Sequence, residues 1–197
     1  MKIIGLTGSV ATGKSLVANL INKRGFKVLD ADKISESLLQ PHSSLLKEIA
    51  KILGDKILKK DGTLDREIIR QLIFDDPEKR KLLDSIMHPA VAKKIKRLLN
   101  NLEQSGTSIV FIEAPLLFET GYQKELDETI LVYANENQQL KRLVDRDKCS
   151  LDHAKKMIAS QMPIDQKLKL ANHVIDNSGT IEETERQVEG LIKYFSK

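Results

Sequence analysis

The chain has 197 residues, of which 41% are hydrophobic, 30% charged and 4% aromatic, and its formal net charge is +4. This composition excludes a disordered chain and suits one α/β domain with a small inserted subdomain. The single Cys149 excludes a disulfide framework and a cysteine-based zinc site. No apolar run approaches the ~20 residues of a membrane span, and the start turns to glycine too early for a signal peptide. We therefore expect a cytoplasmic protein with no membrane partner.

The N-terminal residues predict a strand, a helix and a second strand. Residues 2–7 are a short apolar run that predicts a buried strand, and residues 14–24 place their apolar side chains on one helical face. Gly25 is expected to end this helix, and residues 26–29 predict the next strand. This order predicts a parallel unit with a right-handed crossover.

The rest of the chain predicts a helical insertion and the return of the strands. From about 33 to 104, apolar residues recur at three- and four-residue steps, and Asp61-Gly62 predicts a turn. Pro77 and Pro89 stand where helices can begin. The later elements are expected in this order: strands at 108–112 and 129–133, helices through 136–171, a strand at 173–175 and a helix near 181–195.

The segment from Gly8 to Ser15 fits the pattern G-x-x-x-x-G-K-[ST] at every fixed position. Glycines at its two ends let the backbone curl so that successive N–H groups point at phosphate oxygens, and the helix that follows adds its positive end. Lys14 is expected to reach the β- and γ-phosphates and Ser15 to ligate Mg²⁺. The predicted ATP-binding residues of this loop are Gly8, Ala11, Thr12, Gly13, Lys14, Ser15 and Leu16. The alternative is a chance glycine-lysine turn, which the flanking strand and amphipathic helix argue against.

The remaining motifs favour a small-molecule kinase among P-loop proteins. The Asn/Thr-Lys-x-Asp pattern of a GTPase is absent, although Asn177 follows the last predicted strand and is expected to border an adenine. A motor or AAA-type ATPase would be longer. A kinase needs an acceptor site, an acid near the acceptor hydroxyl, polar ligands for Mg²⁺ and cations over the transferring group. We therefore expect an α/β fold of the P-loop NTPase type, with a parallel sheet between helices.

Candidate acids follow two of the predicted strands. Asp30 and Asp32 come just after the second strand, at the edge where parallel sheets bind ligands, and only one of them is expected to point at the phosphate loop. Glu113 follows the strand at 108–112, where an acid would contact Mg²⁺ directly or through water. The alternative for Asp30 and Asp32 is that both are solvated turn or N-cap residues. The alternative for Glu113 is a surface salt bridge.

Candidate cations lie in the charged segment. Arg142 and Arg146 are one helical turn apart, so both guanidinium groups share a face and are candidates for a lid over the triphosphate. The same spacing beside Asp145 and Asp147 equally describes an exposed helix with salt bridges.

With these residues assembled, the sequence resembles the dephospho-coenzyme A kinase family over almost its whole length. The phosphate loop is common to many families, whereas the order of the Asp-Ala-Asp, His-Pro and Pro-Leu-Leu-Phe-Glu blocks is far more specific. The segments that carry the resemblance are Gly5 to Ser15, Asp30-Ala31-Asp32, Gly62 to Arg66, His88-Pro89, Pro115 to Glu119, Arg142 with Arg146-Asp147, Gln161-Met162-Pro163 and Ile175 to Gly179.

The resemblance implies transfer of the γ-phosphate of ATP to the ribose 3′-hydroxyl of dephospho-coenzyme A, with Mg²⁺. It implies three parts: a nucleotide-binding core of residues 1–32, 105–140 and 171–197, a helical acceptor domain of 33–104 and a lid of 141–170. Asp32 is then the expected base or orienting acid, and Lys14 and Arg142 the expected transition-state cations. The acceptor site is expected to include Asp32, Arg66, His88, Leu116, Leu117, Phe118 and Glu119. From the residues alone, the Leu-Leu-Phe run also fits a core segment, and His88 fits a helix-entry residue.

Several positions differ from the usual family pattern. Ser9 and Ala11 stand where glycines are common, and Glu113 stands where an aspartate is frequent. Met157 occupies a lid position that often holds arginine, for which Lys155 or Lys156 are expected to compensate. These differences concern the lid and the adenine side rather than the reaction class.

The distribution of charge fits small polyanionic substrates. Residues 1–40, 41–105 and 141–169 carry net charges of +3, +4 and +4, while 106–140 with 170–197 carry −7. The basic residues form no stripe and the aromatic residues no stacking platform, so we expect no nucleic-acid partner. We expect a monomer or weak homo-oligomer. A nucleoside or nucleotide kinase on the same fold, and a binding factor switched by ATP, are the alternative functions.

Overall fold

A computed structural model of the chain describes residues 1–196, apart from the side chain of Asp75. It divides into two compact units, Met1–Asp30 with Gly106–Lys197, and Ala31–Ser105. We call them the sheet unit and the helical unit and describe each by itself.

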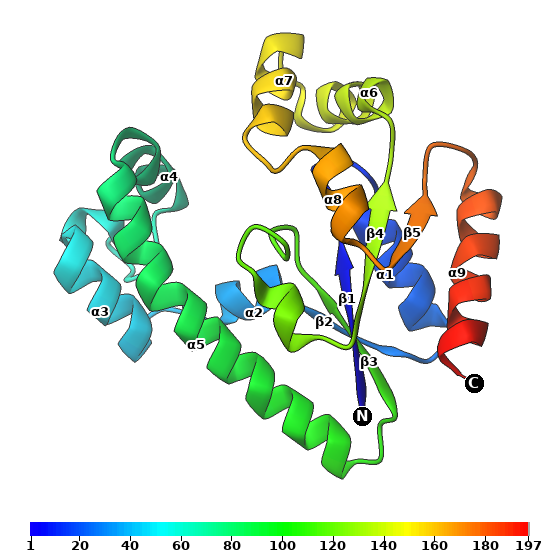
Figure 1. Cartoon of the computed structure of the whole chain (residues 1–197). Helices are drawn as coiled ribbons and strands as arrows, with labels where there is room; N and C mark the ends of the chain where they lie inside the picture. Colours follow the sequence, from blue (N-terminus) through cyan, green and yellow to red (C-terminus); the bar gives the residue numbers. More distant parts are fainter. Residues whose placement is uncertain (197) are drawn as a thin grey trace. The chain divides into compact units, whose positions relative to one another are not determined.

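The sheet unit is built on five parallel strands in the order β2-β3-β1-β4-β5 (Figure 1). The strands are β1 (Lys2–Thr7), β2 (Lys27–Asp30), β3 (Ile109–Glu113), β4 (Glu128–Tyr133) and β5 (His173–Asp176). The chain leaves β1 toward one edge of the sheet and later returns to build the other edge from β4 and β5. Such a reversal of strand order opens a crevice at the carboxyl ends of the strands, where ligands bind. The predicted fold class, a P-loop NTPase-type α/β sheet, is confirmed.

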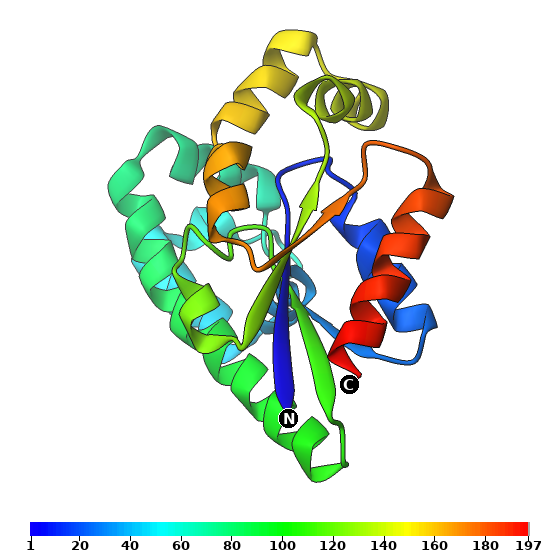
Figure 2. The ribbon, with the colours of Figure 1, turned by 45° about the vertical axis from the view of Figure 1, so that its right-hand side comes forward.

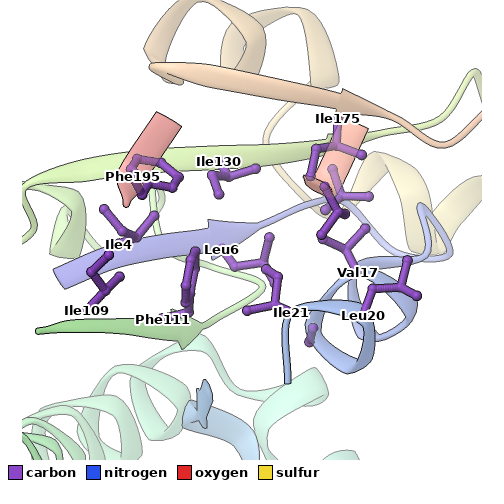
Figure 3. Close-up of a cluster of buried hydrophobic side chains, with 13 residues drawn as sticks. Ile4, Leu6, Val17, Leu20, Ile21, Ile109, Phe111, Ile130, Ile175 and Phe195 are labelled. Carbon is purple, nitrogen blue, oxygen red and sulfur yellow. The ribbon is translucent and has the colours of Figure 1, made fainter. Parts of the chain in front are cut away.

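Two helices, α1 (Lys14–Lys23) and α9 (Ile181–Phe195), lie side by side on one face of this sheet (Figure 2). Their apolar faces and alternate strand residues form the main core (Figure 3). This core consists of Ile4, Leu6, Val17, Ala18, Leu20, Ile21, Ile109, Phe111, Ile130, Val132, Ile175, Val188 and Phe195. Because side chains alternate along a strand, residues of β1 and β3 that follow these core residues at two-residue steps also point toward α1.

The remaining helices of the sheet unit are α6 (Glu136–Asp147), α7 (Leu151–Ala159) and α8 (Ile164–Leu170). α6 contacts α7, and α8 packs beside β4. A short 3₁₀ helix, η2 (Tyr122–Glu125), precedes β4. The sequence predicted helices through 136–171, and the structure breaks that stretch at 148–150 and at 160–163.

The helical unit contains α2 (Ala31–Leu38), α3 (Ser44–Leu53), the 3₁₀ helix η1 (Asp55–Ile57), α4 (Arg66–Asp75) and α5 (Pro77–Gln104). Its own core is formed by Ile49, Ala50, Leu53, Ile57, Leu72 and Met87. The predicted turn at Asp61-Gly62 is present, because Gly62 has a positive φ of 77° and donates to the Lys59 carbonyl.

The two prolines expected at helix starts behave differently. Pro77 is the first residue of α5, and the Asp76 side chain caps that helix by accepting from the amides of Glu78 and Lys79. Pro89 lies inside α5, so the prediction that a helix begins there was wrong. A proline removes one N–H donor, but the rest of this 28-residue helix keeps its hydrogen-bond ladder and its packing on α2 and α4. No helix within residues 1–196 has both the length and the apolar character that crossing a membrane requires.

Candidate active site

The phosphate-binding segment joins the carboxyl end of β1 to the first turn of α1. Two residues in it have left-handed backbones, Ala11 with φ 60° and Gly13 with φ 91°. The Thr12 hydroxyl donates to the Ser9 carbonyl at 2.9 Å, which closes the turn from inside. α1 then starts at Lys14 without a side-chain cap, so its first amides stay available for an anion.

The two motif glycines are required because neighbouring atoms lie too close to leave room for a Cβ. A Cβ on Gly8 would lie 2.5 Å from the Thr12 hydroxyl and 2.8 Å from the Val132 carbonyl oxygen. A Cβ on Gly13 would lie 2.0 Å from the Asn177 side-chain nitrogen, in addition to the strain of its positive φ. The sequence pattern therefore reflects packing as well as backbone conformation.

Lys14, Ser15 and Glu113 meet at the carboxyl edge of the sheet. Lys14 Nζ lies 2.6 Å from Glu113 Oε1, and the Ser15 hydroxyl donates to the same oxygen at 3.2 Å. The Lys14 and Glu113 side chains are only 14% and 7% exposed. Glu113 ends β3 opposite Leu6 of β1, on the face that α1 covers, which brings it to the start of that helix. Glu113 is thus a buried partner of the motif lysine and not a surface glutamate.

The oxygens of Ser15 and Glu113 suit a magnesium ion. Mg²⁺ prefers hard oxygen ligands and is usually bound through one or two protein oxygens together with substrate phosphates and water. A hydroxyl and a carboxylate oxygen 3.2 Å apart beside the phosphate loop match that donor set. A cluster of three or more acidic, histidine or cysteine ligands does not occur among the described residues.

Arg142 on α6 lies against the phosphate loop. Its guanidinium donates to the Asn177 carbonyl at 2.8 Å and to the Ala11 and Thr12 carbonyls at 3.4 Å. The Asn177 side chain donates to the Thr12 carbonyl at 2.7 Å and accepts from the Thr184 hydroxyl at 2.9 Å. Asn177 was expected to border an adenine, and in this structure both ends of its amide are bonded to protein.

Arg146 has different surroundings. Its guanidinium makes two bonds to the neighbouring Asp147, at 2.7 and 2.9 Å, and its side chain is 58% exposed. The hydrogen bond from Arg146 lowers the pKa of the Asp147 carboxyl. The structure therefore brings Arg142 to the loop and pairs Arg146 elsewhere.

The two candidate acids after β2 fall in different units. Asp30 is the last residue of β2 and pairs in register with Glu113, so the two share a face of the sheet. Asp32 is exposed in the first turn of α2, in the helical unit.

The segment after β3 presents one exposed and two buried apolar residues. Leu116 is 39% exposed, whereas Leu117 and Phe118 belong to the buried core. The Glu119 carboxylate pairs with Lys167 at 2.7 Å and accepts from the Met162 amide at 3.2 Å. Of the expected acceptor residues in this segment, Leu116 is thus exposed, Leu117 and Phe118 lie in the core, and Glu119 forms an ion pair with the buried Lys167.

The two other expected acceptor residues lie in the helical unit. Arg66 starts α4, and its exposed guanidinium pairs with Glu36 at 2.8 Å. His88 lies within α5 and is 58% exposed, so it is a mid-helix residue and not a helix-entry residue.

Sequence reasoning missed three buried or half-buried polar residues around this site: Thr184, Gln161 and Lys167. Thr184 and Lys167 are fully buried, and the Gln161 side chain accepts from the Val10 amide at 2.8 Å. Gln161 belongs to one of the segments that carry the resemblance. Lys167 gave no signal, because a lysine on a short charged helix is usually solvated.

Comparisons with known proteins agree over nearly the whole chain. A family model described as dephospho-CoA kinase matches residues 2–183. A dephospho-CoA kinase of Shouchella clausii is 43% identical over 185 residues, which is 94% of each chain.

Two similar structures have been solved. One, from Thermus thermophilus, has a TM-score of 0.85 at 34% identity and covers 98% of this chain and 97% of that one. A dephospho-CoA kinase from Campylobacter jejuni has a TM-score of 0.75 at 33% identity and covers 100% and 98%. The phosphate loop, its half-buried lysine and the full-length similarity lead to one conclusion: the chain belongs to the dephospho-CoA kinase family and is a nucleotide-binding kinase.

Proposed function

We propose that the protein transfers the γ-phosphate of ATP to the ribose 3′-hydroxyl of dephospho-coenzyme A, which yields coenzyme A and ADP. The observation that carries this proposal is the family match over residues 2–183, which includes an intact phosphate loop with a half-buried Lys14. The match does not favour the two alternatives, a nucleoside or nucleotide kinase and an ATP-switched binding factor.

On the donor side, the phosphates of ATP occupy the loop from Gly8 to Ser15. Its backbone amides and the first turn of α1 supply hydrogen bonds to the phosphate oxygens. Lys14 exchanges part of its bond to Glu113 for the β- and γ-phosphates, and Arg142 extends its free N–H groups over the transferring group. Little covalent chemistry is needed from the protein, so these fixed positive groups account for most of the rate.

Mg²⁺ bound with ATP neutralises charge on the β- and γ-phosphates, and Ser15 and Glu113 are the residues that would hold it. Asp30 is in register with Glu113 and would be a further carboxylate near the residues that hold the ion. Arg146, once released from Asp147, is a second cation for the lid.

On the acceptor side, Asp32 orients the 3′-hydroxyl and takes its proton as the phosphoryl group transfers. The residues that the family resemblance assigns to acceptor binding are Leu116–Glu119 in the sheet unit and Arg66 and His88 in the helical unit. Residues 141–170 form a lid that excludes water from the γ-phosphate. We place the protein in the cytoplasm, as a monomer or weak homo-oligomer.

A coupled assay of ADP release tests the reaction. We expect turnover with ATP, Mg²⁺ and dephospho-coenzyme A, and none above background with nucleoside monophosphates. Chromatography of the product should show coenzyme A in a 1:1 ratio to ADP. The absence of turnover that depends on dephospho-coenzyme A would refute the proposal.

A further inference from the structure

A lysine of the sheet unit is buried without an evident role in phosphate binding. Lys167 of α8 has a relative exposure of 0%, and lysines are almost never fully buried unless paired. Its ammonium pairs with Glu119 Oε1 at 2.7 Å and donates to the Pro115 carbonyl at 3.3 Å. Both partners belong to the segment 115–119, one at each end. A single ammonium therefore ties together the two ends of the segment that we assign to the acceptor side.

The same carboxylate oxygen of Glu119 is bonded to the chain just before α8. Met162 donates its amide to Glu119 Oε1 at 3.2 Å. Two donors that are five residues apart thus converge on one oxygen, which fixes the Glu119 side chain to the segment 162–167.

The residue before Met162 reaches the donor side. The Gln161 side-chain oxygen accepts from the amide of Val10 at 2.8 Å, and Val10 lies at the turn of the phosphate loop. Thr7, at the end of β1, adds a weaker link by donating to the Pro115 carbonyl at 3.4 Å. Gln161 and Met162 are adjacent, so one short stretch of chain is bonded to the phosphate loop and to Glu119 at once.

We propose that Glu119, Gln161 and Lys167, which we call the clasp, fix the acceptor segment 115–119 relative to the phosphate loop. Gln161 and Lys167 are then positioning residues that act through Val10 and Glu119 and do not touch the reacting atoms. This inference rests on the proposed function, because that function assigns segment 115–119 to the acceptor side and so predicts that loosening the clasp lowers turnover. It explains the burial of a full charge at Lys167, where an apolar residue of similar volume would serve for packing alone.

The expected consequence is a loss of turnover at unchanged donor binding. Phosphoryl transfer depends on holding two substrates in near-attack geometry, and a displacement of about 1 Å can cost about 10²-fold in rate. The nucleotide contacts of Lys14 and Ser15 do not pass through the clasp. Loosening it should therefore lower kcat and leave the dissociation constant of ATP nearly unchanged.

Four variants test the clasp: Lys167→Met, Gln161→Leu, Gln161→Glu and Lys169→Met. Lys167→Met removes the charge and keeps most of the volume, and Gln161→Leu removes only the acceptor for the Val10 amide. Gln161→Glu keeps that acceptor and is the conservative rescue. Lys169→Met is the matched control, because Lys169 is an exposed lysine on the same helix.

We expect kcat to fall at least tenfold in Lys167→Met and about fivefold or more in Gln161→Leu, with the dissociation constant of a fluorescent ATP analogue within twofold of the wild type. Lys169→Met should stay within twofold of the wild-type kcat. Gln161→Glu should lose less kcat than Gln161→Leu, because it keeps the acceptor for the Val10 amide although it adds a negative charge beside the phosphate loop. If Lys167→Met does not fold, the two Gln161 variants decide alone. A wild-type kcat in Gln161→Leu, or an equal loss in Gln161→Glu, would overturn the proposal.

A second readout separates this inference from the proposed reaction. In ¹⁵N NMR spectra of the folded variants, Lys167→Met should shift the Val10 amide resonance and speed its hydrogen exchange, although Lys167 makes no bond to Val10. Lys169→Met should not. An unaltered Val10 amide in Lys167→Met refutes the clasp whatever the substrate is, whereas wild-type protein inactive on dephospho-coenzyme A refutes only the reaction.

Discussion

Two lysine–glutamate pairs lie at opposite ends of the same sheet. At the carboxyl ends of the strands, Lys14 and Glu113 are 2.6 Å apart. At the amino ends, Lys2 of β1 and Glu128 of β4 are 2.5 Å apart, and Glu128 also contacts His173 of β5. The first pair is the more deeply buried, with 14% and 7% exposure against 36% and 18%.

The surroundings of the pairs explain their different roles. Lys14 opens a helix whose first amides are uncapped, next to two residues with left-handed backbones. Lys2 lies over the rings of Tyr194 and Phe195, at 5.6 and 5.0 Å, and closes the end of the core. We infer that the carboxyl end is arranged for an incoming anion and the amino end for holding β1, β4, β5 and α9 together.

The largest effect should separate the two lysines. Lys14→Met should lower kcat by about 10³-fold or more, because it removes a cation aimed at the transferring phosphate. Lys2→Met should keep kcat within twofold and lower the melting temperature by a few degrees. Steady-state kinetics and thermal unfolding of both variants measure this. Similar kcat values in the two variants would contradict the division of roles.

The acid after β2 extends the comparison to the acceptor side. Asp32→Asn should lower kcat by about 10²–10⁴-fold, the usual range for a positioned acid or base, with the KM for ATP nearly unchanged. Asp165→Asn, at an exposed acid in the first turn of α8, is the control and should have no effect. Full kcat in Asp32→Asn would remove Asp32 from the mechanism.

Two arginines of α6 provide a comparison within the carboxyl end. Arg142→Lys should lower kcat by about 10–100-fold, because a lysine cannot reproduce the fork that bonds Asn177, Ala11 and Thr12. Arg146→Lys should lower it less than fivefold, because Arg146 is exposed and pairs with Asp147. A larger loss in Arg146→Lys would show that the lid depends on Arg146 in the closed complex.

The amino end should show its role in the pH dependence of stability. Burial alone would raise the pKa of Glu128, but hydrogen bonds from Lys2 and His173 bring it below its usual value. The carboxylate therefore stabilises the fold above about pH 4.3, the ordinary pKa of glutamic acid, and this stabilisation is lost as pH falls through the lowered pKa.

Glu128→Gln should lower the melting temperature by about 2–4 °C at pH 7, as expected for a loss of ~1 kcal/mol in a chain of this size. The gap to the wild type should close toward pH 3, and kcat at pH 7 should be unchanged. Thermal unfolding between pH 7 and pH 3 measures it. A gap that does not depend on pH would assign the effect to packing.

The sequence predicted more of the carboxyl end than of the amino end. The pattern from Gly8 to Ser15 is local, so strand, loop and helix follow from adjacent residues. For the pairing of Glu113 with Lys14, the sequence indicated only that Glu113 follows a strand. Lys2 and Glu128 carried no signal at all, because their contact depends on which strands become neighbours in the sheet.

Buried polar residues in helices were the hardest to foresee. Lys167 and Thr184 lie in helices with many charged neighbours, where a solvated position is the ordinary expectation. Pro89 was misread for the opposite reason: the local rule for proline was correct, but tertiary packing of a long helix outweighed it.

The smallest expected effect concerns strain in the phosphate loop. Among the described residues other than glycine, positive φ occurs at Ala11, His42 and Lys148. A left-handed backbone costs an alanine about 1–2 kcal/mol, and glycine avoids this at an entropic cost of ~0.5–1 kcal/mol. Ala11→Gly should therefore raise stability by about 0.5–1 kcal/mol and the melting temperature by about 1–3 °C.

Ser9→Gly is the matched control in the same loop. Since Ser9 is outside that positive-φ set, glycine there relieves no strain and should lower stability by about 0.5–1 kcal/mol. Chemical denaturation of both variants measures the difference, and its sign is the test: a loss of stability in Ala11→Gly would mean that the loop holds Ala11 without strain. If the expected sign is found, the carboxyl end of the sheet keeps a strained backbone next to its anion site. The amino end, whose strands begin at Lys2, Glu128 and His173, has no positive φ at these residues.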